Sequence, residues 1–470
     1  MRHLSALDAL FLQLETPETP MHVGSLMLLR STPKTRRDAY RAIRDHLASR
    51  MHLAPVFSRR LAFIPGDIAN PAWLRAGEVD LDHHVQRLRL PKPGTQVQLE
   101  AAVARLHEQL LDRARPLWQV AVIEGLGSGE IGYYSKVHHA ALDGQGGMAV
   151  AQAILDLEPR PGKKPGPGRG QLPALAAKRL PPSTAKLVAS VLRHTVSQYG
   201  RILKALPETV TALARGAAVA ITSGDLRRRG LKTGPRTRMN APIGAQRLFA
   251  TVRIPLEDVK AIARDHGAKV NDVVLAICAG ALRRQYAREP GALARPMIAA
   301  VPLSLRAPGD TDAANAVTML LVGLGTGIKD PAERLAAIVA ASTQAKRLAG
   351  SLKGAIPTDI PLLGIPWLMA RLAPLYRNAV AAKRVPVMAN LVISNVPGPQ
   401  VPLYLAGMKL TAYFPVSAVT HGLGLNVTIV SYDGSMDFGL VAARSAVPDL
   451  RRFARALEAA HRELMKTIAA

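Results

Sequence analysis

The sequence predicts an α/β protein built from two halves, and three observations support that prediction. Up to about residue 156, short β-rich runs alternate with helical patterns, such as Tyr40, Ile43 and Leu47 at spacings of three and four. A stretch dense in proline, glycine and lysine follows, which is the composition of a linker. From about Asn240, strand and helix patterns alternate again.

The elements of the second half follow from their periodicity and turn residues. We expect a strand over residues 248–254, a helix over 255–266 closed by Gly267, a helix over 271–283, strands over 391–394 and 425–430, and a final helix over 449–468. Residues 410–432 carry no formal charge, but proline and glycine interrupt them. We therefore interpret this segment as paired strands and not as a membrane-spanning helix.

Composition places the chain among globular proteins. Of its 470 residues, 48% are hydrophobic and 20% are charged, which is enough apolar surface to bury a core. The single cysteine, Cys278, excludes an intrachain disulfide and a thiolate metal cluster. The first 20 residues carry three acids and lack a basic start followed by an apolar run, so we expect no signal peptide and a cytoplasmic location.

The charge is strongly positive and unevenly distributed. The net charge is +27, and residues 159–238 alone carry 17 basic and two acidic side chains. Such an excess favours anionic partners. Residues 186–206 form an amphipathic pattern that fits either a solvated helix packed on the core or a helix adsorbed on anionic lipid. Nucleic acid is not expected, because aromatics make up 4% of the chain and the basic stretch lacks regular stacking partners.

The segment with the clearest chemical pattern is residues 131–157. A β-rich run ends on His138 and His139, Asp143 and Gly144 form a turn, and helical spacing follows. A histidine in such a strand-end loop can project into a cleft, and imidazole takes up and returns protons near neutral pH. The pattern therefore makes this loop the candidate site of acid-base chemistry.

A pair of histidines is weak evidence by itself. His83 and His84 are also adjacent, but no Asp-Gly follows them, so we interpret that pair as structural. Zinc ligation by His138 and His139 is disfavoured, because no cysteine lies near them and adjacent residues of an extended segment point to opposite sides. Asp143 is expected to brace the loop or orient an imidazole.

Residues 138–144, His-His-Ala-Ala-Leu-Asp-Gly, match the HHxxxDG signature of coenzyme A dependent acyltransferases. Within them the chain resembles the bacterial wax ester synthase/diacylglycerol acyltransferases. Further matches run through nearly the whole chain in the family's order: residues 4–8 and 20–24, the PLW motif at 116–118, the ND motif at 271–272, and residues 302–306, 394–399, 424–426 and 431–434. HHxxxDG alone is shared with condensation domains, whereas the combination is specific.

The resemblance implies a fold and a reaction. The fold is two chloramphenicol-acetyltransferase-like halves, residues 1–158 and 240–470, each a mixed sheet flanked by helices, with a tunnel between them and a linker over 159–239. The reaction is O-acyl transfer from a long-chain acyl-CoA to diacylglycerol or to a long-chain alcohol, without an acyl-enzyme. Acyl-CoA is then a substrate, and neither cofactor nor metal is implied.

The resemblance also assigns roles in the histidine loop. His139 is implied to be the general base, and His138 to be mainly structural. Asp143 is implied to organise the site by pairing with a basic group, for which Arg306 is the candidate. Gly144 gives the turn its backbone freedom.

Two further motifs are expected near the chemistry. Asn271 is either an oxyanion donor or a helix N-cap, in which case Asp272 favours the positive helix end. Pro116, Leu117 and Trp118 are expected to pack at the base of the cleft. Both alternatives for Asn271 stay open at this stage.

The expected partners are acyl-CoA, diacylglycerol or a fatty alcohol, and an anionic membrane or lipid-inclusion surface to which the protein attaches peripherally. Two other functions stay open. One is a condensation-type acyltransferase that takes its acyl group from a carrier protein. The other is a non-catalytic protein that binds lipid surfaces through its basic stretch. The sequence does not rank diacylglycerol against alcohol or fix an oligomeric state.

Overall fold

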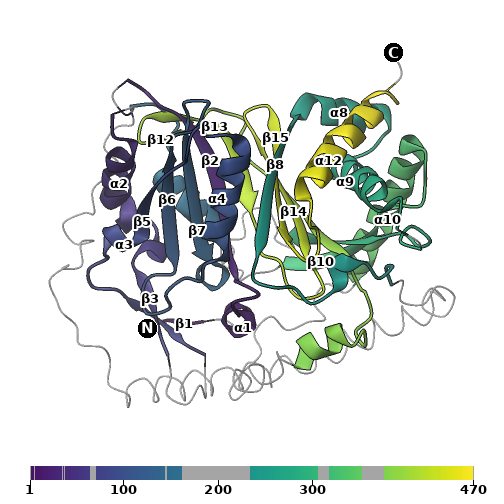
Figure 1. Ribbon diagram of the computed structural model, residues 1–470, viewed down its shortest axis with the longest axis horizontal. Coiled ribbons are helices and arrows are strands. Elements are labelled where there is room, and N and C mark those ends of the chain that lie inside the picture. The colour runs from purple at the N-terminus through teal and green to yellow at the C-terminus, as the bar shows by residue number, and fades with distance from the viewer. Residues whose placement is uncertain are drawn as a thin grey trace. The chain divides into compact units, whose positions relative to one another are not determined.

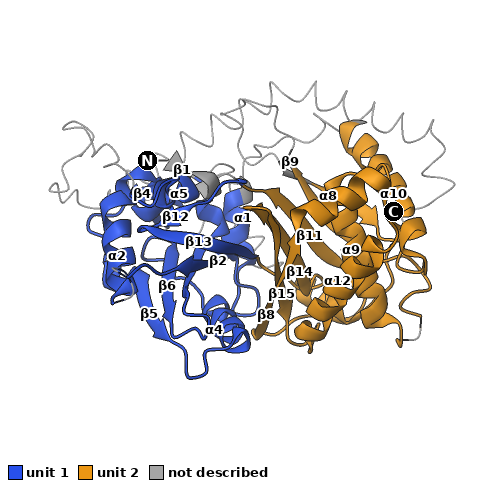
Figure 2. Ribbon diagram, turned by 90° about the horizontal axis from the view of Figure 1, so that it is seen from above, with its two compact units in different colours: residues 1–196, 361–373, 399–416 blue, residues 197–360, 374–398, 417–470 orange. Residues whose placement is uncertain are grey.

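A computed structural model describes residues 2–4, 6–33, 35, 37–63, 70–142, 146–160, 233–289, 291–304, 317–351 and 375–468 (Figure 1). The chain divides into two compact units (Figure 2). Unit 1 comprises residues 1–196, 361–373 and 399–416, and unit 2 comprises residues 197–360, 374–398 and 417–470. Among the described residues, each unit is built on a six-stranded mixed sheet. The predicted α/β fold is confirmed.

The main sheet of unit 1 places the histidine segment at its centre. In spatial order its strands are β12 (Tyr404–Leu405), β13 (Met408–Val416), β2 (His22–Arg30), β7 (Ile131–His138), β6 (Trp118–Glu124) and β5 (Val85–Arg89). Only the β5–β6 pair is parallel within this described sheet. Strand β7 is buried along almost its whole length, including its polar residues Lys136 and His138.

The other described elements of unit 1 surround this sheet. They are a small sheet of β1 (Arg2–His3), β4 (Ala72–Arg75) and β3 (Arg59–Ala62), the α-helices α1 (Ala6–Leu14), α2 (Ala39–Arg50), α3 (Leu81–His84), α4 (Gln96–Glu108) and α5 (Gly146–Ile154), and the 3-10 turns η1 (Met51–Leu53), η2 (Pro55–Phe57) and η4 (His139–Ala141). The turn η4 begins directly after β7, as expected for a loop at a strand end.

Helix α4 is held at both ends by side chains. At its start, the Thr95 N–H donates to Gln98 Oε1 at 2.7 Å, and the Gln98 N–H donates to Thr95 Oγ1 at 3.3 Å, which is a capping box. At its end, Lys136 Nζ donates to the carbonyl oxygens of Leu106 and Gln109 at 2.7 and 2.6 Å. Because Lys136 belongs to β7, this contact fixes the helix to the central strand.

Unit 2 has the same mixed architecture. Its described sheet runs β10 (Val317–Gly323), β9 (Ile298–Ser304), β11 (Leu391–Pro397), β14 (Leu425–Tyr432), β15 (Ser435–Ala443) and β8 (Arg247–Pro255). One face is covered by α8 (Leu256–Asp265), α9 (Val270–Tyr286), α10 (Pro331–Ser351) and α12 (Leu450–Met465), and the short turn η5 (Arg238–Asn240) precedes the sheet (Figure 2). The predicted strands and helices are confirmed, and Cys278 is fully buried within α9.

The interpretation of residues 410–432 as strands is confirmed, although the two strands do not pair with each other. Strand β13 pairs with β2 in unit 1, whereas β14 pairs with β11 and β15 in unit 2. Alternating apolar residues identify a strand but not its partner, so the sequence could not distinguish a hairpin from a crossing between sheets. The sequence also did not anticipate that residues 399–416 belong with the N-terminal unit.

Residues 161–232 of the basic linker, which include the amphipathic segment 186–206, lie outside the described residues, so both interpretations of that segment stay predictions. The tunnel expected between the halves also stays a prediction. In the part of the chain that is described, no helix is both long and apolar enough to cross a bilayer.

Replacing Gly24 by alanine is expected to lower the unfolding free energy by about 2 kcal/mol or more, and the melting temperature is expected to fall with it. Gly24 pairs with Lys136 of β7, and a Cβ there would collide with the carbonyl oxygen of Ser135, which is backbone and cannot move aside. Thermal melting compared with Gly77→Ala, where a Cβ meets nothing within 4 Å, checks this expectation. Equal melting temperatures would contradict it.

Candidate active site

The histidine loop is fixed by backbone hydrogen bonds on both sides. His138 ends β7 opposite His22 of β2. The His138 N–H donates to the carbonyl of Leu117 at 3.0 Å, and the His139 N–H donates to the carbonyl of Met21 at 2.8 Å. Three segments that matched family motifs therefore meet here: the chain before β2, the PLW segment and the histidine pair.

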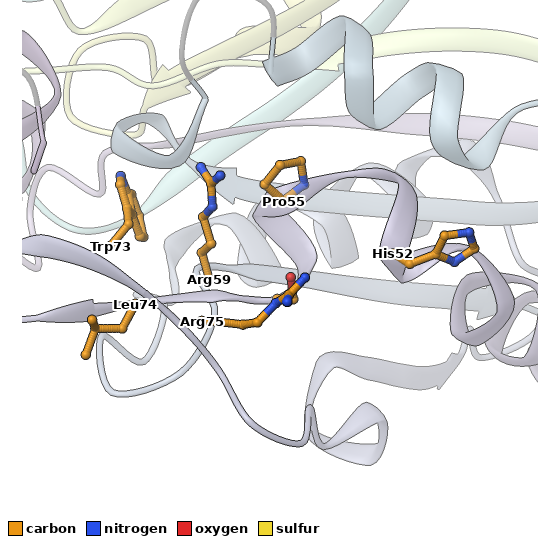
Figure 3. Close-up of a pocket in the computed structure, with 7 residues that line it drawn as sticks. His52, Pro55, Arg59, Trp73, Leu74 and Arg75 are labelled. Atoms are coloured by element: carbon orange, nitrogen blue, oxygen red, sulfur yellow. The ribbon is translucent and has the colours of Figure 1, made fainter. Parts of the chain in front are cut away.

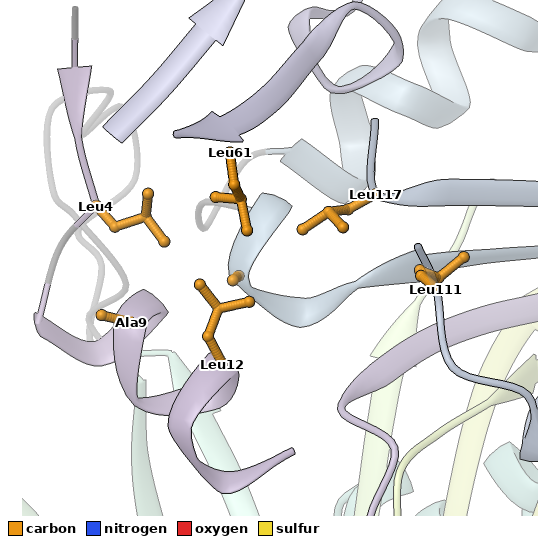
Figure 4. Close-up of a cluster of buried hydrophobic side chains, with 7 residues drawn as sticks. Leu4, Ala9, Leu12, Leu61, Leu111 and Leu117 are labelled. Atoms are coloured by element: carbon orange, nitrogen blue, oxygen red, sulfur yellow. The ribbon is translucent and has the colours of Figure 1, made fainter. Parts of the chain in front are cut away.

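The opening segment packs directly on this loop. Helix α1 contacts the turn η4, and the ring of Phe11 stacks on the ring of His139 with centroids 3.9 Å apart and planes 21° apart. A set of buried apolar side chains, which we call the site cluster, gathers around the turn (Figure 4): Leu4, Ala9, Leu12, Leu61, Leu111, Leu117 and Ala140. The turn that carries His139 is therefore packed against buried apolar side chains.

His138 is fully buried and both ring nitrogens have neighbours. Its Nδ1 accepts a hydrogen bond from the Ala140 N–H at 3.1 Å. An accepting Nδ1 carries no proton, so the proton of the ring is on Nε2. That Nε2 lies 3.2 Å from Oε1 of Glu15. The ring is therefore tied to the turn on one side and to a carboxylate on the other.

Glu15 is a buried carboxylate that the sequence reasoning missed. Its side chain is 2% exposed, Oε1 accepts from the Met21 N–H at 3.1 Å, and Oε2 accepts from Arg113 Nη2 at 2.9 Å. Burial by itself raises the pKa of Glu15, but the contact with His138 and the charge of Arg113 lower the pKa further than burial raises it. Glu15 therefore stays ionised beside the histidines and also holds Met21, the residue that anchors His139.

His139 is poised to accept a proton. Burial lowers the pKa of its imidazole below the ordinary value, the neighbouring His138 lowers it further, and its own backbone opposes both effects. Its Nδ1 is buried and makes no hydrogen bond of normal geometry within the described chain. A ring that is neutral at pH 7 and held by Phe11 suits a general base.

A layer of buried polar groups supports the loop from the sheet. His22 Nε2 donates to the carbonyl of His107 at 2.7 Å, and His107 Nδ1 lies 2.8 Å from the Tyr134 hydroxyl. Burial, followed by the charges of His107 and Lys136, lowers the pKa of His22 well below its ordinary value. Burial lowers the pKa of Lys136 to about 8, although nearby Glu15 opposes this shift. The layer therefore carries little net charge at alkaline pH.

The Lys136→Met variant is expected to lose about 2 kcal/mol of unfolding free energy, because two carbonyls at the end of α4 lose their donor. In the folded protein the pKa of Lys136 is about 8, below the ordinary 10.5. The unfolded chain binds more protons between these values, so Lys136 makes stability rise with pH across that window. Denaturant unfolding at pH 8 and pH 10 is expected to show a shallower rise in the variant.

The matched control for this prediction is Lys260→Met. Lys260 lies on the surface of α8 and pairs with Glu257 at 2.7 Å. Its loss is expected to change the unfolding free energy by less than about 0.5 kcal/mol. An unchanged pH slope in Lys136→Met would contradict the assignment of Lys136 as a buried donor.

The PLW segment packs beside the histidine loop, and the cleft whose base it is expected to line stays a prediction. Leu117 is buried in the site cluster with Ala140. Trp118 is 2% exposed, donates from Nε1 to the carbonyl of Phe57 at 3.2 Å, and stacks on His84 with centroids 4.3 Å apart. His84 in turn bonds through Nδ1 to the carbonyl of Trp118 at 2.8 Å. The contacts of Trp118 are those of a packed core residue.

The N-cap alternative for Asn271 is wrong. Helix α9 begins at Val270, so its cap position is Lys269 and Asn271 lies inside the first turn. The helix start is closed by Asp272, whose Oδ2 accepts from the Lys269 N–H at 3.1 Å. Asp272 is 3% exposed. The aspartate therefore does the capping that the sequence assigned to its neighbour.

Asp143, Gly144 and Arg306 lie outside the described residues, so their roles stay predictions. Asn271 and Asp272 belong to unit 2, whereas the histidine loop belongs to unit 1. Within the described chain, no group of three or more His, Cys, Asp or Glu side chains is arranged to hold a metal ion.

The match to a family model over more than half of the chain identifies the class of protein as an acyltransferase. The chain belongs to the wax ester synthase/diacylglycerol acyltransferase family. Residues 4–274 match the catalytic domain of that family, and residues 313–465 match its C-terminal domain. The resemblance found in the motifs is confirmed.

Relatives and solved structures agree with this membership. The chain is 35% identical to a putative diacylglycerol O-acyltransferase of Mycobacterium tuberculosis over 99% of its own length and 100% of the relative's. It is 36% identical to a probable diacylglycerol O-acyltransferase of the same organism, over 98% of each chain. The structure of a wax ester synthase/diacylglycerol acyltransferase from Marinobacter aquaeolei VT8 matches with 28% identity, a TM-score of 0.70 and 100% of both chains.

The condensation-domain fold is also similar. The first condensation domain of the calcium-dependent antibiotic synthetase matches with 14% identity and a TM-score of 0.53, over 100% of this chain and 98% of that one. At this identity the likeness concerns the fold alone. It agrees with the two-halved, mixed-sheet architecture predicted from the sequence.

Proposed function

We propose that the protein transfers a long-chain acyl group from acyl-CoA to the hydroxyl of diacylglycerol or of a long-chain alcohol, with His139 as the general base. The observation that carries this proposal is the state of His139: burial keeps its imidazole neutral, while Phe11 and the backbone of Met21 hold it in place. A neutral, positioned imidazole is what activation of an alcohol requires.

The proposed transfer is direct, and no acyl-enzyme intermediate forms. His139 takes the hydroxyl proton as the alcohol oxygen attacks the thioester carbonyl. The resulting tetrahedral intermediate collapses, the carbon–sulfur bond breaks, and the imidazolium returns the proton to the CoA thiolate. The products are an ester and free CoA, so atoms and charge balance. Asn271 remains a candidate donor to the oxyanion, and Asp143 with Gly144 the candidate organisers of the loop.

The test is product analysis with purified protein, one acyl-CoA and mixed acceptors. We expect mass spectrometry to find triacylglycerol or wax ester, with one free thiol released per ester formed and no carrier protein present. Turnover only with a carrier-bound acyl group would instead indicate a condensation-type enzyme. No turnover with either donor would leave only the non-catalytic lipid-binding alternative.

We also propose peripheral attachment to an anionic membrane or lipid inclusion on its cytoplasmic side. The net charge of +27 and the apolar nature of the proposed acceptors support this proposal. Flotation with phosphatidylglycerol vesicles, compared with phosphatidylcholine vesicles, tests it. Equal recovery with both lipids would contradict it.

A further inference from the structure

Helix α1 and the residue that follows it contact both histidines of the loop. The ring of Phe11 stacks on the ring of His139, with centroids 3.9 Å apart and planes 21° apart. Four positions further on, directly after the helix ends at Leu14, Oε1 of Glu15 lies 3.2 Å from Nε2 of His138. Side chains four positions apart share one side of a helix. One side of α1 therefore faces the histidine pair, and Phe11 is its contact with His139.

The stacked geometry holds the His139 ring without occupying its nitrogens. The two rings are nearly parallel, so Phe11 covers a face of the imidazole, whereas both nitrogens lie on the edge of that ring. His139 Nδ1 makes no hydrogen bond of normal geometry with any residue that the structure describes. Among those residues, stacking does what a hydrogen-bonded carboxylate does for the histidine of a catalytic triad, which is to orient the ring.

The face of an aromatic ring also attracts positive charge. The π electrons make the face negative, and a cation within about 6 Å of the ring centroid is stabilised. The imidazole of His139, at 3.9 Å, is well inside that range. A general base is neutral before it takes a proton and positive afterwards, so this attraction is largest for the protonated form. An interaction that strengthens as the proton is transferred lowers the barrier to the reaction.

Burial acts on His139 in the opposite direction. It lowers the pKa of the imidazole, because the charged form loses its hydration, and the neighbouring His138 lowers that pKa further. The elements that meet at the turn carry six titratable or charged side chains near the histidine pair: Asp8, Glu15, His22, Arg113, Lys136 and His138. A substitution at position 11 leaves all six in place, so a changed pKa of His139 reports the ring that it removes.

We propose that Phe11 is a positioning residue for the general base: its ring orients the imidazole of His139 and stabilises the imidazolium that forms during acyl transfer. The inference rests on the proposed role of His139. The proton moves from the acceptor hydroxyl to His139 and from there to the CoA thiolate, and Phe11 forms no bond to either substrate.

The experiment measures the pKa of His139 in the full-length protein by NMR titration of labelled histidine rings. The signal of His139 is identified by its absence in His139→Ala. Phe11→Leu keeps an apolar side chain but has no ring face, and it is expected to lower the pKa of His139 by about 0.5 to 1. Phe11→pentafluorophenylalanine keeps the shape of the ring and makes its face positive, so it is expected to lower the pKa at least as far.

The matched control is Trp73→Leu, which also replaces an aromatic ring beside the site cluster by leucine. Trp73 of β4 packs against that cluster as Phe11 does, but among the described rings it is Phe11 that stacks on His139. Trp73 lines a pocket of about 420 Å³ on the small sheet (Figure 3). Trp73→Leu is therefore expected to leave the pKa of His139 at the wild-type value.

Kinetics give a second measurement that a purely structural role would not move. In Phe11→Leu, the rise of kcat with pH is expected to move to lower pH, and the plateau rate is expected to fall about 3- to 10-fold. An unchanged or raised pKa of His139 in both Phe11 variants overturns the inference, as does an equal shift in Trp73→Leu. Should Phe11→Leu melt early, the fluorinated variant decides the outcome, because it retains the shape of the ring.

The titration requires no substrate, so it separates this inference from the proposed function. A lowered pKa of His139 in both Phe11 variants supports the contact with the imidazolium even if the protein transfers no acyl group, a result that would overturn the proposed function alone. A wild-type pKa in both variants, together with an inactive His139→Ala, keeps the proposed function and removes the role of Phe11.

Discussion

The His139→Ala variant is expected to lose ester formation by about 10²- to 10⁴-fold while keeping its fold. Without the imidazole, the attacking hydroxyl has no group to receive its proton, and the departing CoA thiolate has no group to supply one. The measurement is the rate of ester formation from labelled acyl-CoA, with thermal melting and CoA binding measured on the same sample.

The matched control is His83→Ala, from the other adjacent histidine pair, which is expected to transfer acyl groups at the wild-type rate. In the wild type, the rate should rise with pH until His139 is deprotonated and then level off. Because burial lowers the pKa of His139, this rise is expected below the ordinary histidine value of 6.5. An active, well-folded His139→Ala variant would refute the assignment.

The Glu15→Gln variant is expected to lose about 3 kcal/mol of unfolding free energy at pH 7 and to transfer acyl groups more slowly. The amide leaves Arg113 and His138 without their buried negative partner. It also weakens the hold on Met21, whose carbonyl anchors the backbone of His139. Urea unfolding and steady-state kinetics measure the two effects, and we expect kcat to fall more than KM rises.

The contribution of Glu15 to the unfolding free energy is expected to depend on pH. Contacts in the folded protein lower the pKa of Glu15 below 4.5, so its contribution to stability is complete above that value and is lost as pH falls through the folded pKa. The difference between wild type and Glu15→Gln should therefore shrink in acid. Glu78→Gln, at an exposed position, is the control. If the wild type and Glu15→Gln had the same unfolding free energy at pH 7, the buried carboxylate would not stabilise the loop.

The sequence predicted what is encoded locally. Periodicity identified the strands and helices of unit 2, and the order of motifs identified the family and the histidine loop. The pairing of β13 with β2 was not predicted, because a strand's pattern does not name its partner. The boundary of α9 was misassigned at Asn271, because an acid inside the first turn caps that helix.

Glu15 shows why part of the site escaped the sequence reasoning. In the sequence it is one of three acids near the N-terminus, with nothing to separate it from a solvated side chain. It acquires its partners only on folding, when Arg113, 98 positions away, and His138 enclose it. Its place between two motif matches, residues 4–8 and 20–24, was the one available signal.

The pairing of β13 with β2 sets the order in which the molecule can be completed during synthesis. The edge of β2 that β13 covers stays open until residue 416 has left the ribosome. An uncovered strand edge recruits other strands. A fragment that stops at residue 158 would therefore carry His138 and His139 on a sheet with an unpaired strand edge, and it is expected to aggregate.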